Sequence, residues 1–148
     1  MSVLNLYPSM SERILVPYDG SDPAEAALEF AFETFPDAGV TALYVVPVPE
    51  GYWQAFGAAE EIDRKRGRKR GEEILEEATA IAREHDRNLE TVIETGKPDQ
   101  MIVSQAEEEE YDTVVIGSHG REGVSRILLG SVAENVVRRS PTPVVVVR

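Results

Sequence analysis

The sequence predicts an α/β domain built on an open parallel β-sheet with helices on both faces. Short apolar runs alternate with helical stretches along the chain, and no internal repeat or linker divides it. Four of the runs are continuously apolar, which is typical of strands covered on both faces. The resulting β-α-β-α-β-α-β-α-β pattern indicates right-handed crossovers between parallel strands.

Five strands and four helices are expected from these runs. The continuously apolar strands are 13–18, 40–46, 113–117 and 143–147. A fifth run, 88–95, alternates apolar and polar residues, which favours a half-exposed strand at a sheet edge. The helices are expected at 23–36, 60–86, 98–109 and 131–139.

Three of the helices begin at recognisable starting sequences. Asp22 is the expected N-cap of the first helix, with Pro23 at its first position. Ser131 and Glu134 have the spacing of a capping box at the last helix. Pro98 marks the start of the third helix, since proline is tolerated in a first helical turn.

The length of 148 residues favours one domain. Residues 1–11 show no period and are expected to be a mobile tail before a domain spanning 12–148, in which 47–60 forms a long loop. The N-terminus lacks the features of a signal peptide, and no apolar run approaches the length of a membrane span. The protein is therefore expected to be cytoplasmic, with no membrane partner.

Charge and composition exclude several classes of protein. The chain has 27 acidic and 15 basic residues and a net charge of −12, which disfavours nucleic acid as a partner. It has no cysteine, so disulfides, thiolate metal sites and cysteine nucleophiles are excluded. Arginine and glutamate greatly outnumber lysine, a composition that indicates a halophilic source.

The basic run "RKRGRKR" at 64–70 stands out in this acidic chain. Taken alone it is compatible with a nucleic-acid patch. The preferred interpretation is a solvated helix face with acid–base pairs at helical spacing. Gly67 within the run and Gly71 directly after it are expected to weaken the helix there.

The stretch "GSHGREGVSRILLGS" at 117–131 is the strongest candidate for a binding loop. It follows a buried strand and leads into a helix, so it lies where open α/β sheets bind ligands. Gly117 and Gly120 permit unusual backbone torsions and close approach to a ligand. Gly130 and Ser131 open a helix whose free N–H groups suit phosphate. A tight turn alone would also explain the glycines, but the location favours phosphate.

Two other phosphate motifs are excluded. "TGKP" at 95–98 is no Walker A loop, because Thr91 stands where that motif needs glycine and Pro98 follows the lysine. No G-x-G-x-x-G follows the first strand, so a Rossmann dinucleotide site has no support.

The spacing Gly117-x2-Gly120-x9-Gly130-Ser131 is similar to the ATP-binding signature of the universal stress protein family. "ILVPYDGS" (14–21), "LYVV" (43–46) and "GSVAENVVRRSPTPVVVVR" (130–148) also resemble that family's first strand, second strand and C-terminal end. The resemblance covers nearly all of 11–148. It implies a Rossmann-like, adenine nucleotide alpha hydrolase-like domain with strand order 3-2-1-4-5, which agrees with an edge position for 88–95.

The resemblance also implies individual roles around ATP. The residues implied at the adenosine end and the ribose are Pro17, Asp19, Val45, Ile116 and Gly117. Those implied at the phosphates are Gly120, Gly130, Ser131 and Val132. Mg²⁺ or Mn²⁺ is expected to bridge the phosphates.

Several of these positions have alternative explanations. His119 either contacts a phosphate or is a bystander in the loop. Asp19 either meets the ligand or makes an Asx turn before Gly20. Ile116 is also explained as a buried strand residue. Arg121 and Arg126 have side chains long enough to reach the phosphates.

The resemblance favours an ATP-binding regulator of stress response or signalling, acting through ligand-dependent conformation or partner choice. One alternative is a slow ATP hydrolase or phosphotransferase, for which Asp19 is the only good candidate base or metal ligand. Another is a dimerisation module with a vestigial pocket. Relatives pair through the last strand, so a homodimer through 143–147 is expected, which would also cover an exposed valine-rich edge.

Overall fold

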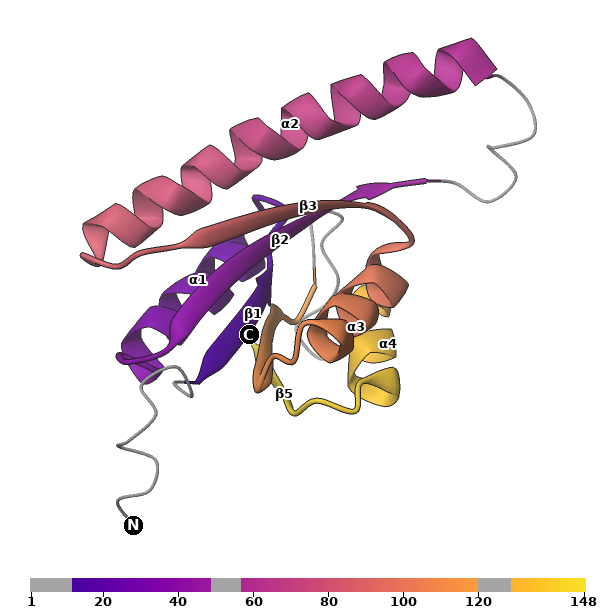
Figure 1. The fold of residues 1–148 in the computed structure, drawn as a ribbon. Coiled ribbons are helices and arrows are strands. Elements are labelled where there is room, and N and C mark those ends of the chain that lie inside the picture. The colour runs from indigo at the N-terminus through magenta and orange to yellow at the C-terminus, as the bar shows by residue number, and fades with distance from the viewer. Residues whose placement is uncertain (1–11, 49–56, 120–128) are drawn as a thin grey trace.

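The computed structural model describes residues 12–48, 57–119 and 129–148, and shows a single five-stranded parallel sheet (Figure 1). The strand order is β3-β2-β1-β4-β5, which confirms the expected topology and the edge position of the half-exposed strand. The expectations for residues 1–11 lie outside the described residues. The strands are β1 (Arg13–Pro17), β2 (Gly39–Pro47), β3 (Glu90–Gly96), β4 (Thr113–Gly117) and β5 (Val144–Val147).

Within the described ranges, four helices cover the two faces of the sheet. They are α1 (Asp22–Thr34), α2 (Gly57–Glu84), α3 (Pro98–Glu108) and α4 (Ser131–Arg139). Side chains of α1 and α2 form one core cluster with the sheet, and side chains of α3 and α4 form the other. No helix in the described part of the chain is long and apolar enough to cross a membrane.

The central strand shows how the sequence builds both clusters. Ile14 and Val16 of β1 are fully buried under α1 and α2, whereas Leu15 between them is fully buried on the other face. Alternation of side chains along a strand requires apolar residues at every position when both faces are covered. Each such side chain contributes about 1.5–3 kcal/mol by leaving water.

The first helix begins one residue earlier than expected, which corrects its N-cap. Ser21, not Asp22, is the N-cap: its hydroxyl oxygen accepts a hydrogen bond from the N–H of Ala24 at 3.3 Å. Asp19 holds Ser21 in place, because its Oδ1 accepts from the Ser21 N–H at 2.9 Å. The Asx turn, one of the two explanations considered for Asp19, is therefore present, and it sets the start of α1.

The glycines of the second helix have a packing role that the sequence did not show. A Cβ at Gly67 would lie 2.4 Å from Cγ1 of Val46, and a Cβ at Gly71 would lie 2.6 Å from Cδ2 of Tyr44. Both positions therefore need glycine for α2 to approach β2 so closely. The helix also begins at Gly57, inside the expected loop 47–60.

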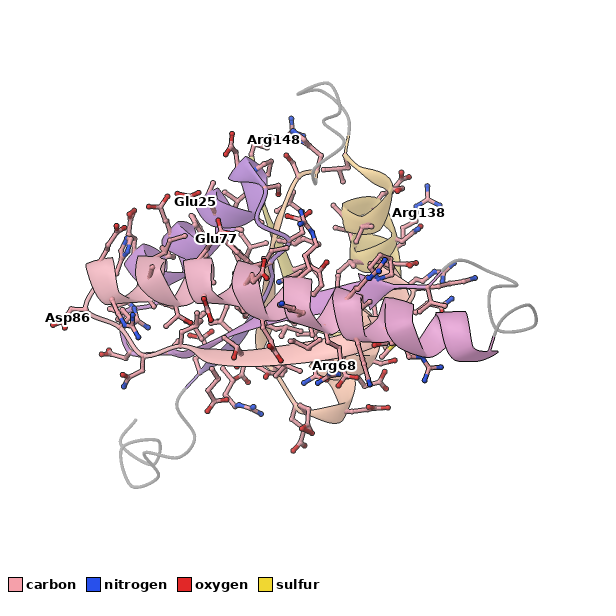
Figure 2. The ribbon with its side chains drawn as sticks, turned by 90° about the horizontal axis from the view of Figure 1, so that it is seen from above. Glu25, Arg68, Glu77, Asp86, Arg138 and Arg148 are labelled. Atoms are coloured by element: carbon pink, nitrogen blue, oxygen red, sulfur yellow. The ribbon has the colours of Figure 1, made fainter. Side chains whose placement is uncertain are left out.

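The basic run 64–70 forms part of this helix, and its charged side chains are solvated, as the preferred interpretation predicts. All six of its arginine and lysine side chains are exposed. Figure 2 shows α2 crossing in front of the sheet with charged side chains along its length, among them the labelled Arg68 and Glu77.

The net charge of −12 leads to a prediction about salt. Self-repulsion destabilises the compact state in dilute buffer, and the screening length falls to about 3 Å at 1 M salt. The midpoint of thermal unfolding is therefore expected to rise from dilute buffer to molar KCl. Melts followed by circular dichroism test this, with an equal osmolality of sucrose as the uncharged control. Equal midpoints in both salt conditions would contradict the prediction.

Candidate functional site

A cavity of about 460 Å³ lies at the carboxyl ends of β1, β2 and β4. Nine of the ten site residues expected from the sequence line it, whereas Gly120, like Arg121 and Arg126, lies outside the described residues. The nine are Pro17, Asp19, Val45, Ile116, Gly117, His119, Gly130, Ser131 and Val132. Residues from four segments that are separate in the sequence therefore meet at one place. The sequence alone shows only the spacing between the last two of these segments, which contain Gly117 and Gly130.

The sheet topology explains why the cavity forms there. The connection after β1 leads to α1 on one face, and the connection after β4 leads to α4 on the other. Because β1 and β4 are neighbours, the two connections diverge and leave a crevice between them. The volume falls within the range of ordinary small-molecule sites.

The inner wall of the cavity is apolar. Leu43, Ile116 and Ala133 are almost fully buried, and Val45 is half-buried beside them. Ile102 of α3 completes this wall. Such a surface suits a flat, uncharged group of a ligand, because burying it there removes apolar area from water.

Gly117 and Gly130, the two signature glycines that the structure describes, are needed for close packing and not for unusual torsions. A Cβ at Gly117 would lie 2.7 Å from the backbone carbonyl of Pro23. A Cβ at Gly130 would lie 3.1 Å from Cα of His119, and Gly130 has an ordinary φ of −65°. This corrects the torsional explanation given for Gly117. The close approach of α1 and α4 to β4 is the physical reason.

The start of α4 also differs from the expected capping box. Gly130 is the N-cap, so Ser131 is the first helical residue. The Gly130 N–H donates to the Ser118 carbonyl at 2.7 Å, and the Gly130 carbonyl accepts from the Glu134 N–H at 2.9 Å. This pairing fixes Gly130 as the residue that leads into the helix. The exposed hydroxyl of Ser131 is therefore not needed as the N-cap.

The amino end of α4 forms the polar part of the cavity. The N–H groups of Ser131, Val132 and Ala133 precede the first intrahelical donor, Glu134, so helix geometry leaves them without an intrahelical acceptor. All three residues line the cavity. Together with the positive end of the helix dipole, they favour an anionic group at this wall.

His119 lies between the strand and this helix end. Its Nδ1 is 3.0 Å from the hydroxyl oxygen of Ser118, which is buried. The ring lines the cavity from there. This contact orients the imidazole, and the backbone of His119 lies next to Gly130, the N-cap of α4.

The described residues offer little for direct metal binding. They contain no group of three or more histidine, aspartate or glutamate side chains that could hold an ion. Asp19 and His119 are the acidic and imidazole side chains on the described cavity wall. A divalent ion at this site would therefore take most of its ligands from phosphate oxygens and water, as Mg²⁺ commonly does.

Sequence reasoning missed four polar residues of the cavity wall, which are Tyr18, Ser21, Tyr44 and Arg70. Tyr18 follows β1 directly, and Arg70 comes from the basic run on α2. The run itself was visible, but nothing in the sequence showed that its last member reaches the site. The apolar pattern indicated Tyr18 only as the end of a strand.

Burial of Tyr18, reinforced by Glu25, Glu77 and other neighbouring carboxylates, raises the pKa of its phenol to about 12. The folded chain thus favours the neutral phenol. Its contribution to stability is complete below pH 10, the ordinary value, and is lost as the pH rises toward about 12. The amount is at most about 2–3 kcal/mol.

We therefore expect one late step in an alkaline titration of phenolate absorbance. The step comes from one of the five tyrosines and should be missing in Tyr18→Phe. The free energy of unfolding should also fall less steeply above pH 10 in that variant. A titration of Tyr18→Phe identical to that of the wild type would show that another tyrosine carries the shift.

The fold and the cavity define an open α/β domain with a cavity at the switch point between β1 and β4, where domains of this class bind ligands. The sequence matches the Universal stress protein family over residues 10–148. A universal stress protein of Methanocaldococcus jannaschii is 34% identical, with 99% of this chain and 88% of that protein covered. This chain therefore belongs to the universal stress protein family.

Solved structures agree with this assignment. A universal stress protein in complex with cAMP has a TM-score of 0.70 at 28% identity, covering 93% of this chain and 97% of the other. The universal stress protein of Archaeoglobus fulgidus in complex with dAMP has a TM-score of 0.62 at 27% identity, covering 93% and 98%. Both therefore share the fold and most of the length of this chain.

Proposed function

We propose that this chain binds an adenine nucleotide, with ATP as the ligand that its signature fits best. The observation that carries the proposal is the meeting of the Gly117 and Gly130-Ser131 ends of the signature at one cavity, beside the amino end of α4. That wall favours negative charge, whereas Leu43, Val45, Ile102 and Ile116 give the cavity an apolar surface as well. A ligand with a flat base and a phosphate chain matches both.

Two relatives support the adenine part of the proposal, since they were solved with cAMP and with dAMP. In this chain, the base would lie against Val45 and Ile116, with Asp19 at the adenosine end. The phosphates would meet the N–H groups at the start of α4 and the hydroxyl of Ser131. Mg²⁺ or Mn²⁺ would be held by the phosphates, because the described residues lack a carboxylate cluster.

We propose a regulatory role, in which bound nucleotide changes conformation or the choice of partner. Hydrolysis needs a base that positions water, and Asp19 is the one carboxylate on the described cavity wall. That carboxylate accepts the Ser21 N–H in the turn before α1. Its structural role explains its presence without catalysis, so slow hydrolysis is the second candidate.

Mass spectrometry of the nucleotide that copurifies with the protein tests the proposal directly. The same protein, stripped of nucleotide, is then titrated with Mg-ATP by isothermal calorimetry. We expect saturable binding, and a single-turnover assay separates a regulator from a hydrolase. Stripped protein that shows no binding at millimolar ATP would refute the assignment.

We also propose that two copies pair through β5. This strand lies at the edge of the sheet, next to β4 alone among the described strands. An open edge of four valines favours pairing with another strand. A two-fold partner would cover it without generating an open fibre.

A further inference from the structure

Arg70 brings a positive charge to the cavity from α2, and we propose that its guanidinium binds the phosphates of the nucleotide. The inference rests on the proposed function, because it concerns the same ligand. Among the described residues, Arg70 is the only arginine or lysine on the cavity wall. The carboxylate of Asp19 is on the same wall. In a chain of net charge −12, a polyphosphate needs such a local cation to offset repulsion.

Two glycines hold Arg70 near the cavity. Gly67 and Gly71 bring the backbone of α2 against Val46 and Tyr44 of β2, at distances that leave no room for a Cβ. Arg70 immediately precedes Gly71, so its side chain leaves the helix beside the carboxyl end of β2. Tyr44 and other residues of that strand end also line the cavity. A larger residue at 71 would lift α2, and Arg70 with it, away from the site.

The direction of the side chain follows from helix geometry. Arg70 and Glu77 are seven residues apart, which is about two turns, so they project from the same side of α2. The charge of Glu77 acts on Tyr18, a residue of the cavity wall. Figure 2 shows Glu77 on the side of α2 toward Glu25 and Arg68 on the opposite side. Arg68 is also absent from the cavity wall formed by the described residues.

The guanidinium of Arg70 is available to an anionic ligand. Its side chain is exposed, and no carboxylate whose side chain the structure describes forms an ion pair with it. Arginine binds phosphate through two parallel N–H donors, which a lysine cannot reproduce. Arg70 and the amino end of α4 line the same cavity, so the phosphates would lie between them.

Calorimetric titration of the full chain with adenosine, AMP and Mg-ATP tests this inference. The variants are Arg70→Ala, Arg70→Lys and the matched control Arg68→Ala, which removes the same charge from the other side of the helix. We expect Arg70→Ala to weaken ATP binding by about tenfold or more, the effect of losing a charge-assisted hydrogen bond. Adenosine binding should stay within about twofold, and Arg70→Lys should lie between. Arg68→Ala should leave both affinities within about twofold of wild type.

Each of the other outcomes overturns the inference. Unchanged ATP binding in Arg70→Ala would show that the side chain does not touch the ligand. Equal losses of affinity for adenosine and for ATP in Arg70→Ala would show that the side chain contacts the nucleoside and not the phosphates. Equal losses in Arg70→Ala and Arg68→Ala would indicate a general effect of charge. Wild-type protein that binds neither adenosine nor ATP would refute the proposed function as well as this inference. The first three outcomes refute the role of Arg70 alone, so the two failures are distinguishable.

Discussion

Gly130→Val is expected to abolish most of the affinity for Mg-ATP. A Cβ at this position already lies 3.1 Å from Cα and 3.2 Å from Cβ of His119, and valine adds two methyl groups beyond it. The loop end and the start of α4 must then separate. The N–H groups of Ser131 and Val132 would move from the positions where phosphate meets them.

The size of the effect follows from the hydrogen bonds that the phosphates would no longer receive. A hydrogen bond to a charged group contributes about 1.5–3 kcal/mol, so removing two weakens binding by about a hundredfold or more. Ser131→Ala removes one hydroxyl donor and leaves the backbone in place, so about tenfold is expected. Isothermal titration of both variants with Mg-ATP measures the difference.

The chain offers a matched control for this experiment. Gly39 begins β2, at the end of the strand away from the cavity, and a Cβ there meets nothing within 4 Å. Gly39→Val should therefore fold and bind Mg-ATP as the wild type does. This control shows whether a loss of binding comes from the position of Gly130 or from any change of glycine to valine. Binding that is unchanged in Gly130→Val would place the nucleotide elsewhere in the molecule.

The order of elements was predictable because it depends on local patterns. Continuous apolar runs such as 113–117 can be buried only in a sheet covered on both faces, and helices must then cross between the strands. The order of the strands came from the resemblance to a family, since no pattern within one sequence states which strands are neighbours. The alternating run 88–95 independently indicated one edge.

The details that were missed depend on packing between distant segments. Asp22 and Ser21 are both good N-caps, and the choice falls to Ser21 because the Asp19 carboxylate fixes its N–H. Gly67 and Gly71 looked like weak points in a helix until β2 was placed against them. The approach of Arg70 to the cavity depends on that same packing.

The candidate site was found from the spacing of its glycines and from the strand that precedes them. Gly117 and Gly130 line the cavity, but the torsional reason given for Gly117 was wrong, because this residue packs against the Pro23 backbone and has no positive φ. A sequence shows that a position needs glycine more readily than it shows which neighbour requires it. Tyr18 was missed because its burial and its surrounding carboxylates come from three segments.

Val146→Pro is expected to convert the proposed dimer into a monomer. The carbonyls of Pro143 and Val147 accept hydrogen bonds from β4, at 2.9 Å from the Val114 N–H and 2.8 Å from the Ser118 N–H. Backbone groups alternate in direction along a strand, so those of Val146 point to the open edge. Proline there removes a donor from the proposed interface and leaves the ladder with β4 intact, as is usual for proline in an edge strand.

Val146→Thr is the matched control, because it keeps the shape of the side chain and the N–H. We expect the wild type and this variant to be dimers at micromolar concentration and Val146→Pro to be a monomer, as measured by light scattering.

Val145→Lys should also weaken the dimer, but Val145 packs against the cluster under α1, so the variant loses stability as well. Thermal melts separate loss of the dimer from loss of fold stability. For Val146→Pro we expect a monomer that keeps its melting transition. Monomeric wild-type protein would remove the hypothesis, and a dimeric Val146→Pro would place the interface on another surface.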